Sequence, residues 1–265
     1  MGWAKYLEDI VSRRNGTSRV QAEIKQVAER HEPPKAVAKK IGDRVMSRLK
    51  EFTASTARPL PVLLLADVSG SMSTNGKIDA LNDAVQEMLE SFGGEDDSRA
   101  EIHVSIITFG KGGAKVHQPL VPATKVQWTR MTAAGGTPMG AAFGAATGMI
   151  EDRAQIPSRA YRPTIVLVSD GQPDDGWQAP LQRLLGAERA SKAARFAMGI
   201  GDDADEAMLS AFLATPEARV YRAHEARQIK QFFRWVTMSV TQRSRSANPD
   251  SVIAAEPTEL DDFNF

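Results

Sequence analysis

The sequence predicts an α/β protein: a Rossmann-like, doubly wound and mostly parallel sheet flanked by helices, preceded by an N-terminal helical extension. Short apolar runs that suit buried strands alternate along the chain with longer segments whose apolar residues recur at helical spacing. This alternation is typical of parallel sheets covered on both faces. The chain has 265 residues and 42% hydrophobic content, which is enough for one sizeable core, and it shows no internal repeat.

Residues 1–58 form the predicted extension of short amphipathic helices. Three apolar stripes at helical spacing are separated by Asn15 and Gly16 and by Pro33 and Pro34, which interrupt helices. The segment holds 13 basic and 7 acidic residues, a net charge of +6. Three roles stay open for it: packing as a helical subdomain, binding a partner, or lying on an anionic membrane surface.

Residues 59–243 form the predicted α/β domain. Its first strand, 61–66, is a continuous apolar run of the kind that is buried on both faces. The next helix, 77–92, places Ile78, Leu81 and Val85 on one face and ends at a glycine pair. The same two patterns predict the remaining elements in order: strands 102–109 and 116–121, helix 139–153, strand 164–169, helix 179–185, strand 195–200, a helix from about 204, strand 219–221 and helix 225–240.

Residues 244–265 are predicted to be an acidic, disordered tail. The part from 249 to 265 holds five acidic residues and no basic ones, a net charge of −5. Its last residues alternate acids with large apolar side chains, so a short docking motif and an ordinary solvated terminus both stay open.

Composition excludes several classes of protein. The formal net charge is zero, which argues against binding nucleic acid through bulk charge, and 6% aromatic content argues against a base-stacking surface. The chain has no cysteine, which excludes disulfides, thiolate zinc sites and cysteine nucleophiles. It has no apolar run approaching the roughly 20 residues that span a bilayer, and no apolar signal region follows Met1. We therefore expect a cytoplasmic protein that binds no nucleic acid and does not depend on a membrane.

Two carboxylates follow predicted strands at the same edge of the sheet. Asp67 ends the first strand and is followed by Ser69 and Ser71, and Asp170 ends a later strand. Thr137 stands on a glycine-rich loop that opens a helix. Because ligands bind such sheets at the carboxyl ends of the strands, where the strand order reverses, we expect these five residues to converge. Two carboxylates and three hydroxyls without His or Cys suit Mg²⁺, with Mn²⁺ as the second choice.

The pattern Asp-x-Ser-x-Ser at 67–71, the Gly-Gly-Thr-Pro loop at 135–138 and the Asp-Gly pair at 170–171 resemble a von Willebrand factor A (VWA) domain with an intact metal-ion-dependent adhesion site. More narrowly, the chain is similar to the bacterial tellurium-resistance-associated, TerY-like group. That similarity covers about 59–246 and is carried by four stretches: Pro59–Val62, Ser169–Trp177, Gly199–Asp205 and Phe232–Val240.

The resemblance implies a role for each site residue. Ser69, Ser71 and Thr137 would coordinate the metal through hydroxyls, and Asp67 and Asp170 would act directly or through water. An Asp or Glu of a protein partner would complete the coordination. The narrower group further implies a scaffold in a stress-response, tellurium-resistance or defence system, with kinase-like and PP2C-type phosphatase proteins as partners.

The spacing of the same residues argues against an enzyme. The segment Gly70–Ile78 superficially suggests a phosphate loop, but it has five residues between its glycines and lacks the final Ser or Thr. An aspartyl phosphatase built on Asp67 would need a second carboxylate at the position of Ser69. We therefore predict a non-enzymatic binding protein. The alternatives are a VWA subunit coupled to an AAA+ ATPase, as in chelatase-like systems, and a metal-dependent hydrolase.

Five further acids follow predicted strands of the domain. Asp202, Asp203 and Asp205 stand where a helix begins, which predicts capping. Asp174 and Asp175 are expected to be solvated loop acids, or else contacts to a partner.

Overall fold

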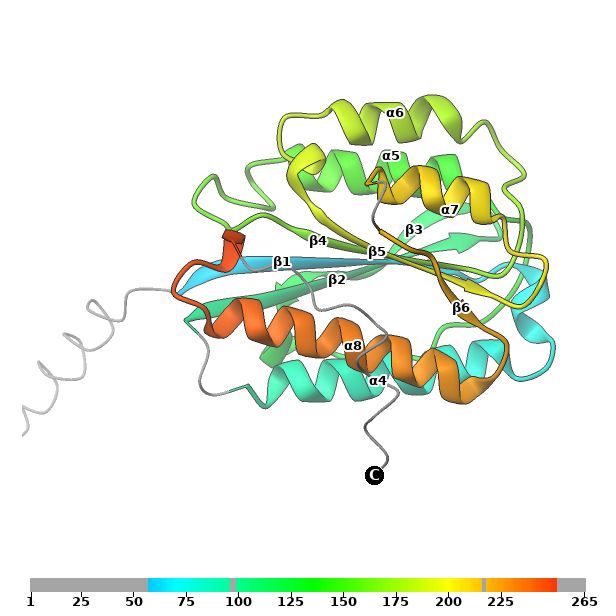
Figure 1. Cartoon of the computed structure of the whole chain (residues 1–265), viewed down its shortest axis with the longest axis horizontal. Coiled ribbons are helices and arrows are strands. Elements are labelled where there is room, and N and C mark those ends of the chain that lie inside the picture. The colour runs from blue at the N-terminus through cyan, green and yellow to red at the C-terminus, as the bar shows by residue number, and fades with distance from the viewer. Residues whose placement is uncertain (1–56, 96–98, 216–217, 252–265) are drawn as a thin grey trace, which may run out of the picture. The chain divides into compact units, whose positions relative to one another are not determined.

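The computed structural model describes residues 57–95, 99–215 and 218–251. The predicted helices of the extension and the end of the predicted tail, 252–265, lie outside the described residues. Within them the α/β fold is confirmed as a six-stranded sheet in the order β3-β2-β1-β4-β5-β6 (Figure 1). All neighbouring strands pair in parallel except β2 and β3. The strands are β1 (Arg58–Asp67), β2 (Ala100–Gly110), β3 (Gly113–Pro122), β4 (Thr164–Ser169), β5 (Ala194–Ile200) and β6 (Tyr221–Ala223).

Strand β1 is the central strand because its apolar run supplies side chains to both faces of the sheet. Leu60 and Leu64 belong to the core on one face, whereas Leu63 and Leu65 belong to the core on the other, and all four are fully buried. Successive side chains of a strand alternate between faces, so only a continuous apolar run satisfies both cores. β1 pairs with β2 on one side and β4 on the other, which makes its carboxyl end the place where the strand order reverses.

Five helices cover the two faces. α4 (Lys77–Gly93) and α8 (Ala226–Arg245) lie together on one face, and α5 (Met139–Glu151), α6 (Gln178–Gly186) and α7 (Glu206–Leu213) cover the other (Figure 1). Each buries an apolar stripe, as its spacing predicts. Asp205 caps α7 by accepting a hydrogen bond from the Met208 amide at 3.0 Å, which confirms its predicted role. No helix in the described parts of the chain is long and apolar enough to cross a membrane.

The structure moves two predicted boundaries. β6 runs from Tyr221 to Ala223 instead of over 219–221, because these three residues are the ones that pair with Met198–Ile200 of β5. The tail was predicted to be disordered from residue 244, yet α8 continues to Arg245 and a 3-10 helix follows at Pro249–Ser251. The reason is Arg243, whose buried guanidinium donates hydrogen bonds to the Pro249 carbonyl at 3.0 Å, Thr164 Oγ1 at 2.6 Å and the Arg162 carbonyl at 2.9 Å.

Candidate metal centre

Asp67 is the last residue of β1, and its side chain is held from two directions. Oδ1 accepts a hydrogen bond from the Ser69 amide at 2.8 Å, and Oδ2 accepts one from Ser169 Oγ at 2.5 Å. The residue is fully buried, and burial raises the pKa of Asp67. The hydrogen bonds from Ser169 and Ser69 lower that pKa, and the negative charge of Asp170 raises it further. Both bonds come from neutral donors, and no ion pair to Asp67 occurs within the described residues, so its charge lacks a counter-ion.

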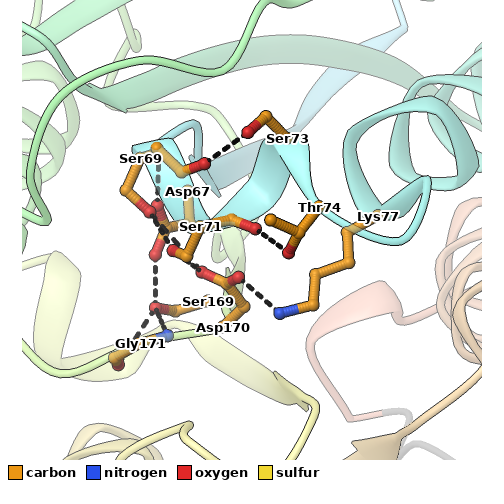
Figure 2. A network of polar contacts seen from close by, with 10 residues as sticks. Asp67, Ser69, Ser71, Ser73, Thr74, Lys77, Ser169, Asp170 and Gly171 are labelled. Atoms are coloured by element: carbon orange, nitrogen blue, oxygen red, sulfur yellow. Dashed lines mark hydrogen bonds and ion pairs between the residues drawn. The ribbon is translucent and has the colours of Figure 1, made fainter.

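Ser69, Ser71 and Asp170 form a cluster of oxygens beside Asp67 (Figure 2). Ser69 Oγ and Ser71 Oγ lie 2.9 Å apart, and both donate to Asp170 Oδ1, at 3.5 Å and 2.7 Å respectively. Asp170 follows β4 directly, and the two serines follow β1, so the parallel pairing of these strands brings the three residues together. The structure therefore unites four of the five predicted site residues in one hydrogen-bonded group.

Thr137 approaches this group from the loop before α5. A Cβ built on Gly171 would lie 3.6 Å from Thr137 Oγ1 and 4.0 Å from Ser71 Oγ, so both hydroxyls face the same glycine. The two loops meet where the Gly70 amide donates to the Gly135 carbonyl at 2.8 Å. Gly135 has φ +88°, and a Cβ there would lie 2.4 Å from the Lys111 amide nitrogen, so only glycine fits. The loop that carries Thr137 is thus fixed by close backbone packing.

The donor set suits a hard divalent cation. Carboxylate and hydroxyl oxygens are the ligands that Mg²⁺ accepts, and it retains water in its remaining positions. In the described residues no group of three or more His, Cys, Asp or Glu side chains is placed to hold a metal ion. A cation at this centre would therefore depend on hydroxyl oxygens as well as on the carboxylates of Asp67 and Asp170. Asp67 is buried and has no ion-pair partner among the described residues, so it gives the site a negative charge that a cation would compensate. The residues present therefore fit a hard divalent cation.

Four residues that the sequence did not assign to the site support it. Ser169 binds Asp67, and Lys77 Nζ lies 2.7 Å from Asp170 Oδ2. Asp174 Oδ2 accepts a hydrogen bond from the Thr137 amide at 2.9 Å. Asp175 accepts two from the start of α5, from the Gly140 and Ala141 amides at 2.8 and 3.0 Å. Asp174 and Asp175 are thus loop acids that position the Thr137 loop, and only their place after a strand could have indicated this.

Comparison with known structures supports the same fold. The pilus adhesin SpaC from Lactobacillus rhamnosus GG matches 72% of this chain at 16% identity with a TM-score of 0.59. A von Willebrand factor type A protein from Catenulispora acidiphila matches 69% at 20% identity with a TM-score of 0.54. Proximal thread matrix protein 1 from the mussel byssus, in a structure described as having a zinc-occupied MIDAS motif, matches 68% at 18% identity with a TM-score of 0.53.

These matches cover only part of the other proteins: 31% of SpaC, 43% of the Catenulispora protein and 47% of the byssus protein. A search of curated protein sequences finds no significant match. The model of the von Willebrand factor type A domain matches residues 62–235, which is more than half of the chain and includes every residue of the candidate centre. The chain therefore belongs to the von Willebrand factor type A domain family.

Proposed function

We propose that this chain is a non-enzymatic scaffold that binds a partner protein through a Mg²⁺-loaded metal-ion-dependent adhesion site, with Mn²⁺ as a possible substitute. The observation that carries the proposal is the oxygen cluster of Ser69, Ser71 and Asp170 beside Asp67, at the carboxyl edge of the sheet. VWA domains mediate protein–protein interactions. The cluster supports the proposal because it offers the carboxylate and hydroxyl oxygens that a hard divalent cation needs.

In this proposal each residue has a defined task. Ser69, Ser71 and Thr137 hold the cation through hydroxyl oxygens, while Asp67 and Asp170 supply negative charge directly or through water. The bound ion supplies a positive centre that attracts an Asp or Glu of the partner. Ser71 is exposed, whereas Asp67 and Asp170 are buried, so the cluster is fixed at its base and open at its rim. In this proposal the partner carboxylate approaches from the exposed side, at Ser71.

The hydrogen bonds of the hydroxyls support a binding role over catalysis. An activated serine nucleophile requires a general base, most often His, within hydrogen-bond reach. Here Ser71 donates to Asp170, whereas His103 contacts Glu101, His117 contacts the Thr129 carbonyl and His224 pairs with Asp202. None of the histidines in the described residues is hydrogen-bonded to these hydroxyls, which supports the proposed role as metal ligands.

The proposed setting is a cytoplasmic stress-response, tellurium-resistance or defence system in a bacterium, with kinase-like and PP2C-type phosphatase proteins as candidate partners. Its support is the resemblance of the stretches around Ser169–Trp177 and Phe232–Val240 to the TerY-like group. Co-purification of the full chain with each candidate, in Mg²⁺ and in EDTA, tests it. Retention in Mg²⁺ alone supports the proposal, and equal retention in both buffers contradicts a metal-dependent contact.

The binding role itself is tested on the pure chain. We expect Mg²⁺ to raise the melting temperature of the wild type and to have a much smaller effect on Ser71→Ala. Ser91→Ala, an exposed serine on α4, is the matched control and should respond like the wild type. Phosphatase and ATPase assays address the enzyme class: turnover that disappears in Ser71→Ala but persists in Ser91→Ala would overturn the scaffold proposal.

A further inference from the structure

Lys77 places a positive charge against the candidate metal centre. Its Nζ lies 2.7 Å from Asp170 Oδ2, and the side chains of Lys77 and Asp170 are 18% and 0% exposed. A Cβ built on Gly201 would lie 3.6 Å from the same nitrogen, so the ammonium is held between the segments that follow β4 and β5. Figure 2 shows Lys77 reaching Asp170 from the side opposite to the serines.

The position of Lys77 in its own helix does not explain this contact. Lys77 is the first residue of α4, where the helix dipole presents its positive end and a lysine is unfavourable. The preceding Gly76 is left-handed, with φ +69°, and provides no side-chain cap. A helix-stabilising sequence would place an acid or a capping residue here. The presence of a lysine at this position is therefore better explained by its ion pair with Asp170 than by any stabilisation of α4.

The two carboxylate oxygens of Asp170 have different hydrogen-bond partners. Oδ2 binds Lys77, and Oδ1 accepts from Ser69 and Ser71. Oδ1 is therefore the oxygen of Asp170 that contacts the hydroxyls of Ser69 and Ser71. Lys77 also offsets one of the two buried negative charges, those of Asp67 and Asp170, so the buried groups carry a net charge of −1. Asp174 is close to the Thr137 amide but is exposed, and solvent screens its charge.

We infer that Lys77 determines the charge of the ligand this site accepts, by keeping the metal-loaded centre positive. A divalent cation added to Asp67, Asp170 and Lys77 leaves a net charge of +1, which an anionic carboxylate neutralises. Without Lys77 the loaded centre would be neutral and would gain little from a charged ligand. The inference rests on the proposed function, and it predicts that the cation and the partner carboxylate bind cooperatively: each strengthens the other.

The test compares Mn²⁺ binding to the full chain, measured by the electron paramagnetic resonance signal of free Mn²⁺. The titration is run in chloride and in acetate at equal ionic strength, with acetate as the carboxylate probe. Lys77→Met removes the charge and keeps the length, and Lys77→Gln is a second neutral variant that can still donate to Asp170. Lys77→Arg keeps the charge. Lys230→Met is the matched control, because Lys230 pairs with Glu87 at 2.6 Å on the α4–α8 side.

We expect Lys77→Met and Lys77→Gln to bind Mn²⁺ about tenfold more tightly than the wild type in chloride, because a nearby repelling charge is gone. Acetate should tighten Mn²⁺ binding about fivefold in the wild type and in Lys77→Arg, and much less in the neutral variants. Lys230→Met should match the wild type. Circular dichroism verifies that each variant is folded.

The outcomes separate this inference from the proposed function. Wild type and neutral variants that bind Mn²⁺ equally, with equal acetate effects, overturn the role of Lys77 and leave the metal-dependent scaffold standing. Binding in the neutral variants but not in the wild type supports the role of Lys77 and contradicts the proposed function. Absence of binding in all variants overturns both. A Lys77 that is merely structural would change the melting temperature without changing the acetate effect.

Discussion

Ser169 Oγ donates a 2.5 Å hydrogen bond to Asp67 Oδ2, and this contact ties the ends of β1 and β4 together beneath the candidate metal centre. Both residues are fully buried. A buried carboxylate that loses a donor is left partly unsatisfied, which is costly. The bond therefore supports the fold and the placement of Asp67 at the same time.

Ser169→Ala should lower the free energy of unfolding by about 1–3 kcal/mol, because the buried Asp67 carboxylate loses a donor. It should also weaken the stabilisation that Mg²⁺ gives. Urea unfolding with and without Mg²⁺ measures both effects. Ser105→Ala is the matched control, since Ser105 is equally buried and donates to the Gln118 carbonyl at 2.9 Å. A Ser169→Ala variant with the full Mg²⁺ effect would show that this contact is structural only.

Asp175→Ala should destabilise the domain by about 1 kcal/mol, because Asp175 caps α5 from a distant loop. The residue before α5, Pro138, provides no side-chain cap, so Gly140 and Ala141 depend on Asp175. Asp203→Ala removes an exposed acid that follows β5 and serves as the control for lost charge. Equal unfolding midpoints for the two variants in urea would contradict the capping role.

Substitution by alanine should change the stability of the domain in opposite directions at Gly135, in the loop before α5, and at Gly144, within α5. Gly135→Ala forces a Cβ to within 2.4 Å of the Lys111 amide at a left-handed φ, so we expect a loss of about 2 kcal/mol or more. Gly144→Ala, in the middle of α5, meets no atom within 4 Å and should gain about 0.5–1 kcal/mol from better helix propensity. The melting temperatures of both variants, compared with that of the wild type, test this prediction. Equal shifts for the two substitutions would contradict the close packing described for Gly135.

The pH dependence of stability should reveal the raised pKa of Asp67. A carboxyl whose pKa is higher in the folded than in the unfolded protein favours folding when protonated. Its contribution is therefore greatest below its ordinary pKa of 3.8 and is lost as the pH rises through the higher folded value. Without metal, Asp67→Asn should be at least as stable as the wild type at pH 7. As the pH falls, the free energy of unfolding of the wild type should rise relative to that of the variant.

The measurement for that prediction is urea unfolding of both proteins in EDTA from pH 4 to pH 8. Asn keeps an acceptor for the Ser69 amide, and the Ser169 hydroxyl can turn to accept from its amide group. The variant therefore removes charge with little change in packing. Parallel stability curves across this range would show that burial does not penalise the Asp67 charge.

Elements with a local signal were predicted well from sequence. The apolar run of β1 indicated a strand buried on both faces, and Asp67 and Asp170 indicated a shared edge because parallel strands end together. The Asp205 cap was also predicted, because Asp205 directly precedes the helix that it caps. These features need no knowledge of which distant segments meet.

Features that depend on distant contacts were missed. Lys77 meets Asp170 across 93 residues, and Asp174 meets Thr137 across 37, so neither pairing has a local pattern. Arg243 extends the ordered chain beyond the predicted boundary through contacts to Thr164 and Arg162. The side chain of a basic residue near a helix end is ordinarily expected to be exposed to solvent. Only the fold shows the buried acceptors to which Arg243 donates.

Calorimetric titration of Mg²⁺ into the chelator-treated full chain measures whether Asp67 and its neighbours bind the ion. We expect saturable binding at one site in the wild type and none in Asp67→Asn, with both proteins folded by circular dichroism. Equal binding to the two proteins would place the metal elsewhere. A wild type that binds no Mg²⁺ would show that these residues do not form a Mg²⁺ site.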